Sequence, residues 1–105
     1  MIEVWPSLKE WLLEQGLGNT QDPQVIMLDN TQYDEFRQWV KDNQTSYRLV
    51  NMRDAPRDGV PKVYRQTPPN AMAENWLWRQ FLTHHRLFYI PDHTQFIFAR
   101  MYWSG

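Results

Sequence analysis

The spacing of apolar residues near the start of the chain predicts an amphipathic helix. Ser7 and Glu10 match the S-x-x-E capping box, in which each side chain satisfies a free backbone N–H at a helix N-terminus. Leu8 and Leu12 follow at helical spacing and supply an apolar side. Gly16 is a natural stop, because glycine readily adopts the left-handed conformation that closes many helices. We therefore expect a first helix that starts at Ser7 and stops at Gly16.

The next apolar runs predict a strand, a helix and a second strand. Residues 24–28 (QVIML) form a short apolar run of strand length. Tyr33, Phe36 and Val40 then fall at i, i+3 and i+7, which places them on one side of a helix. Residues 47–52 (YRLVNM) alternate between apolar and polar positions, as a strand does.

The second half opens with a proline-rich segment and closes with a predicted hairpin. Residues 53–70 contain four prolines and an Asp-Gly turn signal, which favours a long loop, either functional or a solvated connector. A third helix is expected over residues 71–85. Residues 87–103 (LFYI-PDHT-QFIFARMYW) then alternate like two strands joined by a turn at 91–94. The pattern predicts an α+β fold with three helices and a small, mostly antiparallel sheet that ends in a C-terminal β-hairpin.

The predicted third helix has two apolar sides. Trp76 and Phe81 share the broad side that faces the sheet, whereas Trp78 and Leu82 project from the other side. Tryptophan and arginine are the residue types most enriched at binding hot spots. The second side therefore either contacts a partner or packs against the acidic first half of the same chain, and both alternatives stay open. The residues we expect to bind a partner are Arg65, Pro68, Pro69, Trp78, Arg79, Leu82 and Arg86.

Length and composition bound the class of protein. The 105 residues fit one domain, spanning 1–105, with room for a buried core. The absence of cysteine excludes disulfides, thiolate metal sites and thiol catalysis. No apolar run approaches membrane-spanning length, and no basic segment precedes an apolar one at the N-terminus. We therefore expect a soluble, cytoplasmic protein.

Charge is distributed unevenly along the chain. Residues 1–47 carry three Lys or Arg and eight Asp or Glu, whereas residues 48–105 carry eight and four. Such asymmetry indicates a polar partner surface, unless the two halves fold together and neutralise each other. The net charge of −1 favours neither a DNA mimic nor a general nucleic-acid binder.

Chemistry-bearing motifs are scarce in the sequence. There is no glycine-rich phosphate loop, no G-x-S-x-G and no H-E-x-x-H. His84, His85, Asp92 and His93 form the densest group of candidate metal ligands, but adjacent histidines point to different sides of a helix. We therefore expect no catalytic residues, no cofactor and no metal.

Two other functions remain as alternatives. Small RNA-cleaving toxins of the mRNA-interferase type have C-terminal hairpins similar to residues 87–103, and the acting residues here would be Tyr89, His93, Arg100 and Tyr102. A helix followed by a two-stranded wing over residues 71–103 would instead resemble a winged-helix DNA-binding regulator. The supply of basic groups is small for either nucleic-acid function.

The chain resembles the small accessory proteins by which lambdoid phages bind and remodel the host RecBCD helicase-nuclease. The resemblance lies in size, in the lack of cysteine and catalytic motifs, and in the Thr67-Pro68-Pro69 loop ahead of an aromatic helix. It implies a non-enzymatic protein of the bacterial host cytoplasm that docks on a RecBCD subunit and protects phage DNA ends. From the residues themselves, we expect a small protein that binds and inhibits or modulates a bacterial enzyme complex, with direct nucleic-acid contact left open.

Overall fold

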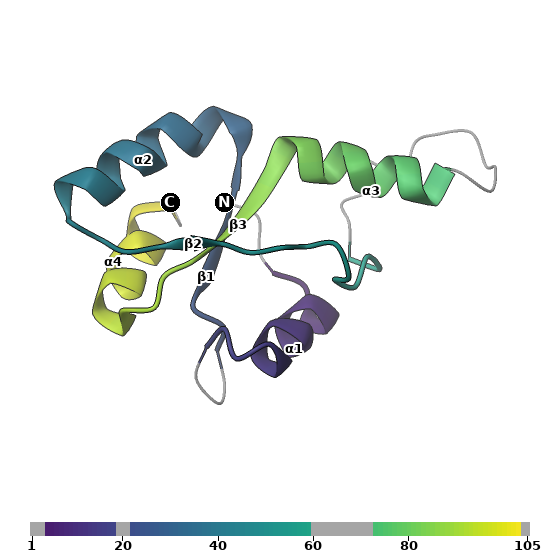
Figure 1. Ribbon diagram of the computed structural model, residues 1–105, viewed down its shortest axis with the longest axis horizontal. Coiled ribbons are helices and arrows are strands. Elements are labelled where there is room, and N and C mark those ends of the chain that lie inside the picture. Colours follow the sequence, from purple (N-terminus) through teal and green to yellow (C-terminus); the bar gives the residue numbers. More distant parts are fainter. Residues whose placement is uncertain (1–3, 19–21, 60–72, 104–105) are drawn as a thin grey trace.

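The chain folds as a small three-stranded sheet flanked by helices. A computed structural model describes residues 4–18, 22–59 and 73–103 and, for residues 73–77, the backbone alone. The elements are α1 (Pro6–Glu14), β1 (Val25–Asp29), the 3₁₀ turn η1 (Asn30–Gln32), α2 (Tyr33–Asp42), β2 (Arg48–Leu49), α3 (Ala73–His84), β3 (His85–Tyr89) and α4 (His93–Trp103). Both strand pairs are antiparallel, in the order β1-β3-β2 (Figure 1). The expected α+β class and antiparallel sheet are confirmed.

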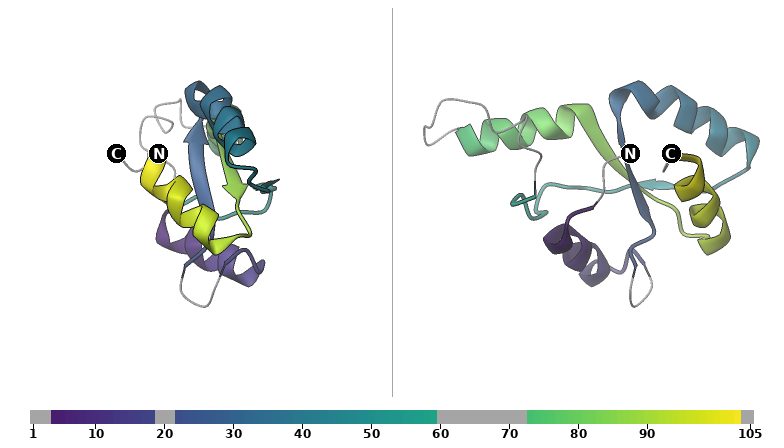
Figure 2. Two further views of the ribbon diagram at one scale, coloured as in Figure 1. Left: turned by 90° about the vertical axis from the view of Figure 1, so that its left-hand side faces the viewer. Right: turned by 180° about the vertical axis from the view of Figure 1, so that it is seen from behind.

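The two faces of the sheet belong to separate apolar clusters. Met27 lies opposite Leu87 across the β1–β3 pair, and both side chains join α1 and α3 in one cluster. Ile26 lies opposite Phe88, and both join α2 and α4 in the other cluster. Since successive side chains of a strand point to opposite faces, a nearly continuous apolar run is needed here. The helices accordingly lie on two sides of the crossing strands, α1 with α3 and α2 with α4 (Figures 1 and 2).

Helix α1 ends as expected but starts differently. It begins at Pro6 with Trp5 as the N-cap, because proline at the first helical position already has a helical φ and needs no N–H partner. The expected Ser7 capping box is therefore wrong, and the Ser7 hydroxyl donates to the carboxylate of Asp58 instead. Gly16 closes the helix with φ of 74°, as its sequence position predicts.

Strand β2 is shorter than residues 47–52 predict. Its ladder covers Arg48 and Leu49, and the Val50 N–H still donates to the Leu87 carbonyl at 2.9 Å. At Asn51 the side chain accepts a hydrogen bond from the Arg53 N–H, a local turn that Asn commonly forms. The chain then leaves the sheet and Met52 enters the core, so the predicted strand stops early.

The predicted C-terminal hairpin is wrong, because residues 93–103 form helix α4. Asp92 caps its N-terminus by accepting a hydrogen bond from the Gln95 N–H at 2.9 Å. Phe96, Ala99 and Trp103 are the buried residues, and their i, i+3, i+7 spacing is helical. Both sides of this run are apolar, so an alternating pattern fits it as well as a helical one. With α4, the described residues hold four α-helices, and the expected count of three is also wrong.

Buried Gln24 joins the start of β1 to the turn before α4. Its side-chain amide donates to the carbonyls of Ile90 at 3.0 Å and Pro91 at 2.9 Å. The Gln24 backbone carbonyl also accepts from the Ile90 N–H. These bonds give partners to the buried Ile90 carbonyl and the partly buried Pro91 carbonyl, and they join the start of β1 to the turn from β3 into α4.

Candidate functional site

The predicted partner-binding residues separate into three groups. Arg65, Pro68 and Pro69 lie outside the residues that the structure describes. Trp78 is buried, with 4% of its surface exposed. Arg79 and Arg86 are exposed and Leu82 is half-buried.

Trp78 packs against the first half of its own chain. It shares a core cluster with Trp5, Leu8 and Leu12, which come from α1 and the residue before it. The guanidinium of Arg57 lies 5.3 Å from the centre of the Trp78 ring. Of the two alternatives that the sequence left open for this side chain, the structure shows the intramolecular one. The expectation that Trp78 is an exposed anchor is therefore wrong, because its side chain is buried in the core.

A stack of aromatic rings runs from α3 into β3. The ring of Phe81 lies 5.7 Å from that of Trp78 and 4.7 Å from that of His85, with both pairs 12° from parallel. Helix α3 passes into β3 without an intervening loop, so the stack bridges the two elements. It packs the C-terminal end of α3 against the start of β3.

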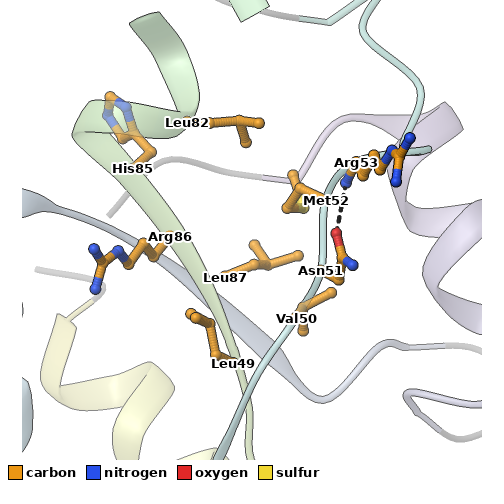
Figure 3. Close-up of a pocket in the computed structure, with 9 residues that line it drawn as sticks. All are labelled: Leu49, Val50, Asn51, Met52, Arg53, Leu82, His85, Arg86 and Leu87. Carbon is orange, nitrogen blue, oxygen red and sulfur yellow. Dashed lines mark hydrogen bonds between the residues drawn. The ribbon is translucent and has the colours of Figure 1, made fainter. Parts of the chain in front are cut away.

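A groove opens where the chain after β2 separates from β3. One wall is residues 49–53, and the other is Leu82 with residues 85–87 (Figure 3). Its volume is about 320 Å³. The turn at Asn51 leads residues 51–53 away from the sheet. This turn lies beside the junction of α3 and β3, so the two walls separate there. We call this site the β2–α3 groove; it brings together Leu82 and Arg86 from the predicted set.

The interior of the β2–α3 groove is apolar, and two arginines, Arg53 and Arg86, are among the residues that line it. Met52 and Leu87 are buried, and Val50 and Leu82 are half-buried at the same place. Arg53 is exposed beside Met52 (Figure 3). The ion pairs that join described residues, Lys9–Asp22 and Arg37–Asp34, both lie in the first half of the chain. Neither of these two ion pairs includes Arg53 or Arg86, the arginines that line the groove.

His85 lies behind the groove in a largely buried position. Burial lowers the pKa of its imidazole below the ordinary value, since the charged form loses hydration there. A hydrogen bond with the Phe81 backbone and the carboxylate of Asp29, directly opposite in the β1–β3 pair, act in the other direction but are weaker. The neutral form is therefore favoured, and a neutral ring suits the stack on Phe81.

A second surface, which the sequence analysis missed, lies on the outer side of α4. Four large apolar side chains are exposed there: Ile97, Phe98, Met101 and Tyr102, with 54% of Phe98 and 68% of Met101 accessible. We call this set the α4 face. Its signal in the sequence was the i, i+4 spacing of Ile97–Met101 and Phe98–Tyr102, which is visible only once the segment is taken as a helix. The Tyr102 hydroxyl donates to Glu35 at 2.6 Å, which fixes one edge of the face to α2.

The RNA-cleaving toxin and winged-helix hypotheses both depend on a C-terminal hairpin, and the structure has a strand followed by a helix there. The toxin hypothesis needs Tyr89, His93, Arg100 and Tyr102 on a hairpin, but only Tyr89 lies on a strand and the other three lie on α4. The winged-helix hypothesis needs a two-stranded wing after α3, and β3 is followed by a helix instead. The hairpin that both hypotheses place in residues 87–103 is therefore wrong, whereas the two functions themselves stay predictions. Among the described residues, no three His, Cys, Asp or Glu side chains gather as a metal site requires.

Comparison of the chain with protein-family models, curated proteins and solved structures finds no match. Within the part of the chain that the structure describes, no helix has both the length and the apolar character needed to cross a membrane.

Proposed function

We propose that the chain is a small, non-catalytic protein that binds a bacterial enzyme complex and inhibits or modulates it. The observation that carries this proposal is the α4 face. Four adjacent apolar side chains on one helix side form an exposed patch of the kind that marks protein-binding surfaces. Aromatic residues and methionine are also the types enriched at interfaces, and the α4 face contains Phe98, Met101 and Tyr102.

The rigid attachment of α4 supports this role. Phe96, Ala99 and Trp103 anchor its inner side, and the Trp103 ring lies 5.6 Å from Phe36 and 5.5 Å from Trp39 on α2. A helix held in this way is ordered before binding, which reduces the entropy that its backbone loses when a partner docks. The resemblance to phage accessory proteins suggests the partner, so RecBCD is the first complex to test. It also places the proposed interaction in the bacterial cytoplasm.

The test is a tagged pull-down from bacterial lysate with the wild-type protein and with Phe98→Ser/Met101→Ser. We expect a stoichiometric bacterial complex that survives nuclease treatment and is lost with the double variant. Arg100→Ser is the matched control, because Arg100 is exposed on the same helix but lies outside the α4 face. Purified RecBCD, assayed for binding and for degradation of linear DNA ends, then tests the candidate partner directly.

The competing outcomes are distinct. A complex retained equally by the double variant would show that the α4 face is not the binding surface. Proteins that disappear with nuclease treatment would indicate a nucleic-acid-mediated association instead. Circular dichroism of each variant separates loss of binding from loss of fold.

A further inference from the structure

Strand β2 is an outer strand of the sheet, and its free edge is open. We propose that two copies of the chain associate by antiparallel pairing of their β2 edges, with Leu49 of one copy opposite Leu49 of the other. The two three-stranded sheets then form one continuous antiparallel sheet. This self-association goes beyond the proposed function and does not involve the α4 face.

The backbone of Leu49 points away from β3. On the β3 side, the neighbouring Val50 N–H donates to the Leu87 carbonyl at 2.9 Å. In an antiparallel pair, successive residues alternate between backbone groups that face the partner strand and groups that face away from it. The N–H and C=O of Leu49 therefore face the free edge, where β2 has no neighbouring strand in the described sheet (Figure 2). One donor and one acceptor are thus directed at the position of a further strand.

The β2 edge is accessible, whereas the edge formed by the other outer strand is closed. In β1, residues 25–28 are each at most 6% exposed, so their backbone is covered as well as their side chains. Residues 46–49 are all exposed, and 41% of Tyr47 and 54% of Leu49 is accessible. A further strand can therefore reach the sheet along β2.

The charged residue of β2 does not guard its edge. Natural edge strands are commonly protected by charged side chains that disfavour pairing with another chain. The guanidinium of Arg48 instead lies 5.2 Å from the centre of the Tyr89 ring, directly opposite on β3. The charge is therefore drawn over the sheet. Tyr47 and Leu49 are two residues apart, so they present their apolar side chains on one face at the free edge.

The β2 edge fits a second copy of itself. With a two-fold axis at Leu49, the outward N–H and C=O of each copy meet the C=O and N–H of the other, as in a hydrogen-bonded antiparallel pair. Leu49 then lies beside its counterpart, and Tyr47 lies opposite Asn51 of the second copy. Arg48 lies opposite Val50, so no like charges face each other. An axis at Arg48 would place two guanidinium groups opposite each other, which is destabilising.

The free edge is short, which limits the strength of the pairing. At one end, Thr45 is buried and its hydroxyl donates to Gln95 on α4 at 2.9 Å. At the other end, Met52 enters the core. Residues 46–51 are left for pairing, and small interfaces of this kind are weak. We expect a dissociation constant between about 10 μM and about 1 mM.

The test follows the mass and the amide exchange of the full-length protein as its concentration is raised. Analytical ultracentrifugation from about 5 μM to about 2 mM should show a monomer–dimer equilibrium. Over the same range, hydrogen exchange measured by NMR should show growing protection of the Leu49 amide, because its N–H becomes bonded only in the dimer. The Val50 amide is the internal control, since its bond to Leu87 is present in the monomer.

Variants locate the contact at the β2 edge. Leu49→Pro removes the outward N–H and leaves the Val50 bond to β3 in place, which is the position where an edge strand tolerates proline. Leu49→Lys keeps the backbone and places two like charges opposite each other across the axis. Each should weaken the dimer by at least about tenfold. Met101→Lys makes the same apolar-to-charged change on the α4 face and should leave the dimer unchanged.

Circular dichroism confirms that each variant is folded, and Leu49→Lys tests the edge even if Leu49→Pro does not fold, because it alters only an exposed side chain. A protein that remains monomeric to about 2 mM would overturn the proposal. So would a dimer that forms without protection of the Leu49 amide, or one that is lost equally with Met101→Lys. Protection of Leu49 only in the complex recovered by the pull-down would assign the edge to a strand of that partner, and would also overturn self-pairing.

Discussion

The indole of Trp78 lies parallel to the ring of Phe81, with ring centres 5.7 Å apart and planes 12° from parallel. This pair belongs to the core and joins α3 to the first half of the chain. On α3, the residues of the predicted set that stay accessible beside Trp78 are the exposed Arg79 and the half-buried Leu82. The arrangement gives Trp78 a role in the stability of the fold.

Trp78→Ala should lower the free energy of unfolding by about 3–5 kcal/mol, as truncation of a large buried aromatic does. Chemical denaturation followed by circular dichroism measures it. Arg79→Ala, one position further along the helix, is the control and should change stability by less than about 0.5 kcal/mol, because Arg79 is exposed. A small effect of Trp78→Ala would contradict its assignment to the core.

Gln44→Gly should stabilise the protein. Gln44 follows α2 with φ of 50°, in the left-handed region, and the adjacent Thr45 N–H donates to the Val40 carbonyl as in a glycine-closed helix end. A non-glycine residue in this conformation costs about 1–2 kcal/mol, partly offset by the greater freedom of glycine in the unfolded chain. We expect a gain of up to about 1 kcal/mol by denaturation. Gln38→Gly, inside the same helix, should instead destabilise by about 1 kcal/mol; similar losses for both variants would refute the argument.

Gln24→Leu should destabilise the protein by about 1–3 kcal/mol, since it leaves the carbonyls of Ile90 and Pro91 without their side-chain donor. Thermal unfolding and hydrogen exchange at the start of α4 measure the effect. Gln38→Leu removes an exposed amide on α2 and serves as the control. Unchanged protection at residues 93–95 in Gln24→Leu would show that these bonds do not hold the turn.

Stability should fall as the pH drops below about 6.5, the ordinary pKa of an imidazole, because burial lowers the pKa of His85 in the folded state. Below about pH 6.5 the unfolded chain binds a proton that the folded chain does not yet bind, so acid favours unfolding; the loss ends once the pH is below the folded pKa. Asp29, whose pKa is also lowered, chiefly through its hydrogen bond with Thr31, contributes in a separate and more acidic window. Denaturation of wild-type protein and His85→Phe across this range measures the difference.

His85→Phe keeps an aromatic ring beside Phe81 and removes the titrating group, so its stability should depend less on pH than that of the wild type. His93→Gln controls for loss of a histidine at an exposed position. A wild-type protein that becomes more stable than His85→Phe on acidification would mean that the folded state prefers the charged imidazole, contrary to this assignment.

Local sequence patterns determined much of this protein. The i, i+3, i+7 spacing of Tyr33, Phe36 and Val40 predicted α2, the apolar run at residues 24–28 predicted β1, and Gly16 marked the end of α1. These signals suffice because each depends on backbone preferences or on a run of buried positions, both of which are encoded within a few residues.

Tertiary structure decided the rest. Residues 96–103 are apolar on both sides, so only the Asp92 cap and the packing of Phe96, Ala99 and Trp103 against α2 and the sheet make the helix the lower-energy choice. The side of α3 that holds Trp78 could have faced a partner or the core, and the presence of Trp5 and Leu8 at the right distance settled it. The groove and the α4 face arise in the same way, because which apolar side chains remain exposed depends on what the distant parts of the chain cover.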